Sequence, residues 1–526
     1  MTAKTSGEDA IAATALYRAA EVMSANGRHS SSRALLGQAI ERDRSVEAAK
    51  PSHDRGVARK DQEYLRELLD LLIQESDDDV APWIRNARDQ FDRHSPYTAE
   101  ELRHRLERLE IMVQSDRSGP LCYVLHMAPP ESHSGYAVRT HHLVRAMQQC
   151  GLDPYCVTRL GFPEDQGFTS DAPFEDVDGI RYHRIVRPGA KKSRSMFYLR
   201  EAAMELAKKL APLNPRAIMA ASNHENSAPA LLAARYLGVP FIYDMRGFWE
   251  LSVLSINPHE YGTPHFIATA GMEAEIAQQA DLVFTLTEAM RDELRRRGVD
   301  NPNIHILPNA ADPEAFRPIR RDEALAKKFG IPDGVPVIGY AGSFTLYEGL
   351  DDLVRACVTL HRKGHDFRVL LVGSEPSHLK DRICPELRAI AEAGGISDKL
   401  IMPGRVPVDE VEQSYSLMDI VPIARKDMAV TELVSPLKPL EAMAMEKAVV
   451  VTDLAALKEI VTDGDTGIVV PRSNPDALAD AFARLLDDPD LRRDLGKRAR
   501  QRVKESRNWN AVAQSFCDVL DGSFPK

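Results

Sequence analysis

A lysine and a glutamate, Lys438 and Glu441, stand three residues apart where the sequence predicts a short helix over about residues 439–445. Pro439 fits a first helical turn, because the missing N–H of proline costs nothing there. The first N–H groups of a helix carry partial positive charge, which favours a phosphate in front of them. Lys438 adds a positive charge, and Glu441 is spaced to accept hydrogen bonds from sugar or ribose hydroxyls. The alternative is an ordinary capped helix with two solvated side chains.

A second group of candidate residues follows expected strands nearer the N-terminus. Gly135 and Tyr136 come after a strand and before a helix, where a glycine lets the backbone approach a ligand closely. His224 lies just beyond an expected strand, where a side chain with a near-neutral pKa is useful. A structural turn and a structural histidine are the alternatives. The loop around Gly135 lacks the pattern G-x-G-x-x-G, which argues against an NAD enzyme.

Strands and helices alternate from residue 120 onward, and this order predicts an α/β protein with parallel sheets covered by helices on both faces. A proline-rich hinge over residues 301–318 separates two such series. The two series predict two doubly wound, Rossmann-like domains, which bind ligands at the carboxyl ends of their strands. The expected strands cover residues 121–129, 154–158, 217–221, 240–243 and 282–286, and then 336–341, 367–372, 400–402, 420–423, 449–452 and 467–470. Of the helices between them, one is expected around residues 229–237 and one over residues 350–362.

The first 116 residues are rich in Ala, Leu, Glu and Arg at helical spacing, which predicts an all-α N-terminal extension. Its first helix pair is similar to a single tetratricopeptide repeat, although such arrays need about three units. A helical module for oligomerisation or for docking a partner protein is the alternative. Expected helices cover residues 10–25, 31–42, 62–74, 81–91 and 99–114, and the predicted domains are residues 1–116, 118–315, 316–505 and 506–526, the last a helix crossing back to the first Rossmann-like domain.

Composition narrows the class of protein. The formal net charge of −11 argues against nucleic-acid binding, which needs a basic face. The six cysteines form no cluster at metal-ligand spacing, so we expect reduced thiols. No secretion signal or long apolar run is visible, and a cytoplasmic location is therefore expected. The basic run over residues 184–200 reads as a solvated loop; contact with anionic lipid at the inner membrane face, or with a phosphorylated acceptor, is the alternative.

Several segments in order resemble the glycosyltransferases of the GT-B fold, and within them the retaining family 4. The resemblance covers roughly residues 120–526, and the ordered set is more specific than any one motif. The segments are the glycine loop at Gly135, HEN at 224–226, LPNAAD at 307–312, YAGS at 340–343, LLVGSEP at 370–376, GRVP at 404–407, SPLKPLEAMA at 435–444 and DGDTGIVVP at 463–471.

This resemblance implies transfer of a hexose from a nucleotide diphosphate sugar to a hydroxyl of a glycan, lipid-linked or protein-linked acceptor. It also implies retention at the anomeric carbon and no metal ion or other cofactor. The catalytic candidate is His224, near the sugar. The donor-side candidates are Gly342, Ser343, Arg405, Val406, Arg425, Leu437, Lys438 and Glu441, and those on the acceptor or sugar side are Gly135, Tyr136, Asp244 and Arg246. For Arg246 a structural salt bridge is the alternative.

The chain departs from the family pattern in two places. The family usually has an arginine and a lysine after the first strand of the second domain, where this sequence has Ser343 and Glu348. We hypothesise that Arg425, Lys426 and Lys438, on loops at neighbouring strand ends, restore the charge, with Arg425 and Lys438 as the main candidates. The loss matters because two charge-assisted hydrogen bonds contribute roughly 1.5–3 kcal/mol each. The earlier of two family glutamates falls on Leu433, with Glu432 one residue away. These departures leave open a non-catalytic scaffold of the same fold, or a nucleotide-sugar 2-epimerase.

Overall fold

The computed structural model describes residues 97–132, 134–168, 172–187, 189–376, 379, 382–407 and 410–524. The described residues fall into two compact units, residues 97–105 with 192–204, and residues 106–191 with 205–524. The helices predicted before residue 97 lie outside the described residues. The helix predicted over residues 99–114 ends early, as α5 (Ala99–Glu107), and residues 111–113 are exposed instead of continuing an apolar stripe.

The second unit contains two separate sheets, as the alternating strands and helices predicted. The first has the strand order β3-β4-β2-β1-β5-β6-β7-β8, and all neighbours in it are parallel except β3 and β4. Strand β1 pairs with β2 on one side and with β5 on the other, so the strand order reverses at β1. The strands are β1 (Leu121–Leu125), β2 (Tyr155–Thr158), β3 (Phe174–Val177), β4 (Ile180–His183), β5 (Ala217–Ala221), β6 (Phe241–Met245), β7 (Leu282–Thr285) and β8 (Ile304–Ile306).

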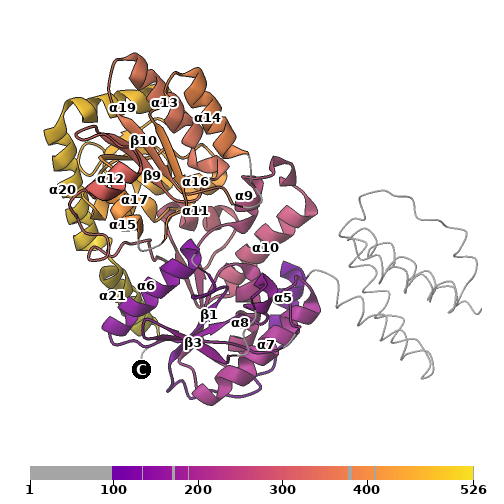
Figure 1. Ribbon diagram of the computed structural model, residues 1–526. Helices are drawn as coiled ribbons and strands as arrows, with labels where there is room; N and C mark the ends of the chain where they lie inside the picture. The colour runs from indigo at the N-terminus through magenta and orange to yellow at the C-terminus, as the bar shows by residue number, and fades with distance from the viewer. Residues whose placement is uncertain are drawn as a thin grey trace, which may run out of the picture. The chain divides into compact units, whose positions relative to one another are not determined.

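The second sheet is parallel throughout, with the order β11-β10-β9-β12-β13-β14. Its central strand β9 pairs with β10 on one side and β12 on the other, so the order reverses at β9. In Figure 1 this sheet lies in the orange part of the chain. The strands are β9 (Val337–Ala341), β10 (Arg368–Val372), β11 (Leu400–Gly404), β12 (Ile420–Ile423), β13 (Ala448–Thr452) and β14 (Ile468–Val470).

Helices cover both sheets. Some begin with a side-chain cap: Asn474, Asp488 and Asn508 each accept a hydrogen bond from a backbone N–H of the helix that follows. The helices after α5 are α6 (Gly135–Gln149), α7 (Met196–Leu210), α8 (His224–Tyr236), α9 (Trp249–Leu254), α10 (Pro264–Gln279), α11 (Glu288–Arg296), α12 (Glu323–Lys328), α13 (Leu350–Arg362), α14 (Ile383–Ala393), α15 (Val411–Ser416), α16 (Ala429–Leu433), α17 (Lys438–Ala444), α18 (Ala455–Lys458), α19 (Pro475–Asp487), α20 (Pro489–Ser506) and α21 (Trp509–Ser523), with 3-10 turns η2 (Glu164–Gln166), η3 (Ala211–Leu213), η4 (Pro258–Glu260) and η5 (Leu346–Glu348).

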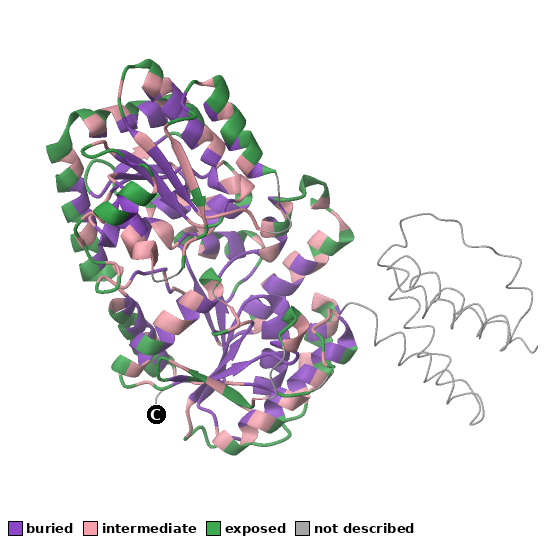
Figure 2. Ribbon diagram, in the orientation of Figure 1, coloured by how far each residue is buried: buried purple, intermediate pink, exposed green. Residues whose placement is uncertain are grey.

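The core follows from the strand sequences. Strands buried on both faces read as continuous apolar runs, and Figure 2 shows the central strands of both sheets as buried. Trp509 and Phe516 of α21 belong to the core cluster of the first sheet, together with Leu143 of α6. Figure 1 accordingly shows α21 beside α6, although α21 follows the second sheet in sequence.

Some predicted boundaries are wrong. Helix α8 begins at His224 rather than near Pro229, because the proline lies inside the helix without ending it. The antiparallel pair of β3 and β4 was not predicted. The basic run over residues 184–200 is not one solvated loop, since Arg184 is buried 2.5 Å from Glu131 and α7 begins at Met196.

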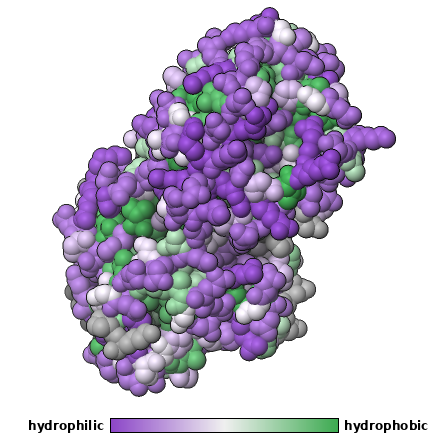
Figure 3. All heavy atoms as spheres, turned by 90° about the vertical axis from the view of Figure 1, so that its left-hand side faces the viewer, coloured by the Kyte–Doolittle hydropathy of each residue, from purple (hydrophilic) through white to green (hydrophobic). Residues whose placement is uncertain are grey.

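One face of the molecule and the length of its apolar helices bear on whether the chain could contact a membrane. On the face drawn in Figure 3, hydrophilic residues predominate and apolar ones form separate small patches. None of the helices in the described part of the chain combines the length and the apolar character needed to cross a bilayer.

Candidate functional site

Three charged side chains meet beyond the carboxyl ends of β9 and β12. Glu348 ends η5 after β9, Arg425 follows β12, and Lys438 is the first residue of α17. Arg425 Nη2 and Lys438 Nζ donate to the same oxygen, Glu348 Oε1, at 2.9 Å and 2.8 Å. We call these three residues the Glu348 cluster. Two of the three cations proposed to restore the missing family charge therefore converge, but on a carboxylate of the chain itself, whereas Lys426 pairs with Asp351 at 2.6 Å.

Burial and the neighbouring charges together set the protonation state of Glu348. The Glu348 side chain is 2% exposed. Burial alone would raise its pKa, but the charges of Arg425 and Lys438 outweigh that effect and hold the pKa at about 2. The carboxylate is thus ionised at neutral pH, and the formal charges of the three groups sum to +1.

The outer part of the Lys438 side chain is held in place. Gly342, at the end of β9, has a φ of +148°, and a Cβ added there would lie 2.2 Å from Lys438 Cε. The ammonium lies 5.1 Å from the centroid of the Tyr340 ring. The Lys438 side chain is 19% exposed, whereas that of Arg425 is 9% exposed. Lys438 is therefore the more accessible cation of the two.

Other donor-side candidates surround these residues. Glu441 lies on α17 and accepts a hydrogen bond from the Tyr415 hydroxyl at 3.1 Å, while burial raises its pKa. Ser343 is exposed, and its carbonyl accepts from the Tyr340 hydroxyl. Leu437 immediately precedes α17 and packs against the core cluster of the first sheet.

The remaining donor-side candidates follow β11, which lies beside β10 at the same carboxyl edge of the second sheet. Gly373, after β10, donates its N–H to the carbonyl of Gly404 at 2.8 Å. The exposed Arg405 donates through Nε to Ser374 Oγ at 2.7 Å, while Val406 packs partly against the core. The structure thus brings Gly342, Arg425 and Lys438 together and leaves Arg405 and Val406 two strands away from β9.

The position of the earlier family glutamate is occupied by Leu433, which has no carboxylate to contact a donor sugar. Leu433 is buried, and its carbonyl accepts a hydrogen bond from Thr287 Oγ1 at 2.6 Å. Glu432 pairs with Arg472 at 2.6 Å and also accepts from the backbone of Ala455. Glu432, one residue away from the family position, is therefore already bound to groups of the chain itself.

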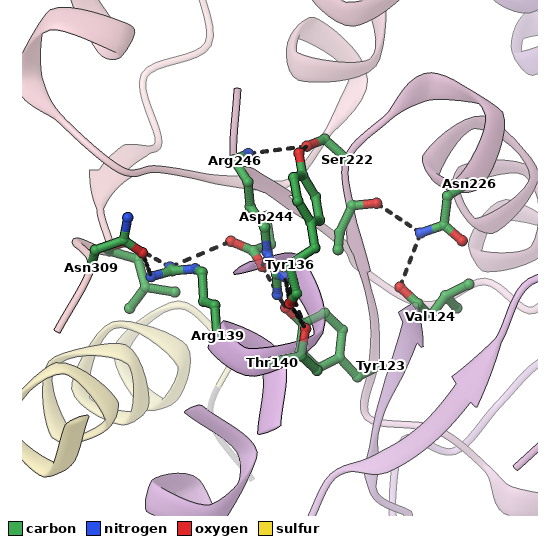
Figure 4. Close-up of polar contacts among 12 residues, drawn as sticks. Tyr123, Val124, Tyr136, Arg139, Thr140, Ser222, Asn226, Asp244, Arg246 and Asn309 are labelled. Atoms are coloured by element: carbon green, nitrogen blue, oxygen red, sulfur yellow. Dashed lines mark hydrogen bonds and ion pairs between the residues drawn. The ribbon is translucent and has the colours of Figure 1, made fainter. Parts of the chain in front are cut away.

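A buried polar network lies at the carboxyl ends of β1 and β6 (Figure 4). Arg246 donates through Nε to Asp244 at 2.7 Å, and through Nη1 to the Tyr136 carbonyl and Thr140 Oγ1 at 2.8 Å each. Its Nη2 donates a hydrogen bond to the hydroxyl of Tyr123. Asp244 and Arg246 are both buried, so the structure favours the salt-bridge interpretation of Arg246: the pair shapes the site rather than presenting free groups to a ligand.

Tyr136 presents its hydroxyl toward two groups that sequence reasoning missed. Ser222 Oγ lies 3.0 Å from the Tyr136 hydroxyl, which also accepts from Trp249 Nε1 at 3.0 Å. Neighbouring Gly135 is exposed, and an added Cβ would meet nothing within 4 Å. Ser222 follows directly after β5, and that position is the signal by which it could have been found.

His224 is buried at the start of α8. Its backbone N–H donates to Glu273 Oε1 at 2.9 Å, and its Nδ1 lies 3.3 Å from the same oxygen. Tyr243 bonds to the other oxygen of Glu273. Glu273, a residue of α10 that the sequence did not single out, therefore orients the imidazole.

One chain of buried hydrogen bonds ties the two sheets of the second unit together. Arg139 of α6 donates to Asn309 Oδ1 at 3.0 Å and to the Leu307 carbonyl at 2.8 Å. Asn309 Nδ2 in turn donates to the Ser435 carbonyl at 2.7 Å, three residues before Lys438. In Figure 4 Arg139 lies between Asn309 and Asp244. Asn309 stands in the segment LPNAAD, so the motif could have indicated its importance.

Comparisons with known proteins bear on this arrangement. A family model described as glycosyl transferases group 1 matches residues 321–502, and one described as glycosyl transferase 4-like domain matches residues 134–310. The alpha-D-kanosaminyltransferase of Streptomyces kanamyceticus is 28% identical over 51% of this chain and 67% of its own length. The alpha-maltose-1-phosphate synthase of Mycolicibacterium smegmatis is 23% identical over 74% of this chain and 96% of its own.

Solved structures share the fold. A sucrose-phosphate synthase from Thermosynechococcus elongatus superposes with a TM-score of 0.61 at 18% identity, over 77% of this chain and 99% of that one. The Anabaena protein HepE superposes with a TM-score of 0.58 at 14% identity, over 77% of this chain and 100% of that one. The two α/β domains of this chain have the GT-B fold of these glycosyltransferases. The chain belongs to the group 1 glycosyltransferases, and it is an enzyme of the hexosyltransferase type.

Proposed function

We propose that this enzyme transfers a hexose from a nucleotide diphosphate sugar to an acceptor hydroxyl, with retention at the anomeric carbon. The Lys438 ammonium, partly exposed beyond β9, is the observation that carries the proposal. Negative charge grows on the departing diphosphate, and a fixed positive charge beside it lowers the barrier. The HepE structures solved with UDP and with UDP-glucose support the choice of donor class.

Other residues take roles around this charge. We assign the ribose hydroxyls to Glu441, whose orientation is supported by the Tyr415 hydrogen bond. We assign the base to Arg405 and Val406, and the phosphates to the backbone of Gly342, Ser343 and Leu437. We assign the transferred sugar to His224, whose ring nitrogen Nδ1 lies 3.3 Å from Glu273 Oε1. Tyr136 and its partners Ser222 and Trp249 form the acceptor side.

The test is a donor screen with the full chain. UDP-sugars and GDP-sugars are incubated with the enzyme in EDTA, and release of the nucleoside diphosphate is measured. A cell extract is then added with the preferred donor, products are found by mass spectrometry, and NMR reads the anomeric configuration. Transfer with retention in EDTA is expected, because the charge on the diphosphate is met by Lys438 rather than by a metal ion.

Three results would refute parts of this proposal. An inverted product would contradict retention, and loss of activity in EDTA would contradict a metal-free reaction. A changed sugar with no acceptor present would identify a 2-epimerase instead.

A further inference from the structure

Lys438 and Arg425 share one carboxylate but differ in what surrounds them. Arg425 is buried and donates through Nη1 to the Val434 carbonyl. Its Nε is also buried and has no hydrogen-bond partner among the described residues. Its guanidinium also lies 5.5 Å from the centroid of the Tyr347 ring. Arg425 is therefore enclosed by the protein and unsuited to contact a ligand. Lys438 lies outside it, over a glycine, with part of its side chain in solvent.

The charges divide in the same way. The buried Arg425 cancels the charge of the buried Glu348, so the pair is neutral as seen from outside. The charge that remains is that of Lys438. A lone carboxylate at this place would repel a diphosphate, and Arg425 removes most of that repulsion.

A lysine without such contacts moves among many rotamers, and fixing it on binding costs conformational entropy. Lys438 is already fixed by three contacts: the flat surface of Gly342, the face of the Tyr340 ring and the oxygen of Glu348. Preorganisation of this kind increases affinity by reducing the cost of ordering the side chain.

We propose that Glu348 is a positioning residue that holds Lys438 in place for the donor diphosphate, and that Arg425 is the internal counter-charge of Glu348 rather than a phosphate ligand. This inference rests on the proposed function. It revises the expectation that Arg425 and Lys438 both contact the donor.

Calorimetry of the full chain with UDP and GDP tests the inference. The variant Glu348→Met with Arg425→Met keeps the summed charge at +1 and replaces the buried pair by apolar groups of similar size, a change that is often tolerated. Binding of the preferred nucleotide should weaken by about tenfold, because Lys438 loses its anchor. Adding Lys438→Ala should then weaken binding little further, whereas Lys438→Ala alone in the wild-type background should weaken it by roughly tenfold to a hundredfold.

A matched control removes an ion pair at the amino ends of β10 and β11, away from the site. Lys399 Nζ lies 2.7 Å from Asp366 Oδ1, and Lys399→Met with Asp366→Met should leave nucleotide affinity unchanged. Glu348→Gln gives a second measurement that does not depend on the double variant folding. It raises the summed charge by one, so electrostatics alone would tighten UDP binding, whereas loss of positioning weakens it.

The outcomes separate the inference from the proposed function. If the wild-type chain binds neither UDP nor GDP, the proposed function and the inference both fail. If the wild type binds and Glu348→Gln, or the double Met variant, binds as tightly or more tightly, the inference alone is overturned, and Glu348 is instead a competitor of the phosphate.

Discussion

Glu348 is a buried carboxylate paired with two cations, Arg425 and Lys438. The resemblance expects a lysine at this position. In the structure it is the shared acceptor of cations that follow it by 77 and 90 positions. Such distant contacts leave no periodic signal in a sequence, so the departure could be noticed but its partners could only be guessed.

The depressed pKa of Glu348 predicts a pH-dependent stability. Its pKa falls from an ordinary 4.5 to about 2 in the folded chain, so the unfolded chain binds more protons between these values. The stabilisation, on the order of 3 kcal/mol, is complete above about pH 4.5 and is lost as the pH falls toward 2. The Tm of Glu348→Gln should therefore lie several degrees below that of the wild type at pH 7, with a smaller gap near pH 4. A gap that stays constant with pH would contradict this assignment, and Asp351→Asn serves as the control.

Two glycines give a matched pair of substitutions. Gly342→Ala would place a Cβ 2.2 Å from Lys438 Cε and force a φ that side chains rarely adopt, so nucleotide affinity should fall by about tenfold or more. Gly522→Ala, on α21, faces open space and should leave nucleotide affinity unchanged. Calorimetry on both variants measures this difference. Equal effects of the two substitutions would show that Lys438 does not depend on the glycine surface.

At the scale of elements, the sequence predicts best where burial is complete. The bounds predicted for β5, β12 and α13 are those of the structure, because an apolar run or a strong helical stripe defines each one. Prediction fails where tertiary contacts decide. The sequence predicts a helix that begins near Pro229, whereas α8 begins at His224 and continues through the proline. Strand β3 alternates between half-buried and exposed residues at a sheet edge, and that pattern is weak over four residues.

Helix α21 is expected to stabilise the first sheet although it follows the second one in sequence. The Phe516 ring is fully buried and lies 5.0 Å from that of Phe284. Phe516→Ala should cost about 3–5 kcal/mol through the cavity it leaves, and should lower the Tm by several degrees. Ser515→Ala, on the exposed face of the same helix, is the control and should change little. A Tm for Phe516→Ala equal to that of the control would mean that α21 does not contribute to this core.

At the scale of the whole molecule, Asn309 links the first sheet to the loop that precedes Lys438. Removal of its amide would leave the Ser435 carbonyl and Arg139 without this partner inside the protein. Asn309→Ala should therefore lower kcat/KM by about tenfold or more, since an unsatisfied buried polar group costs roughly 1–3 kcal/mol. Asn303→Ala removes a more exposed amide that bonds to Asp281, and it should leave kcat/KM nearly unchanged. Similar rates for both variants would show that the link does not serve the site.

The proposed function depends on the positive charge of Lys438 meeting the phosphates of a nucleotide. Titration of the full chain with UDP and with GDP, repeated on Lys438→Ala, measures this dependence most directly. We predict that the wild type binds at least one nucleotide and that the variant binds it at least about tenfold more weakly. Binding of neither nucleotide by the wild type, or equal binding by the variant, would contradict it.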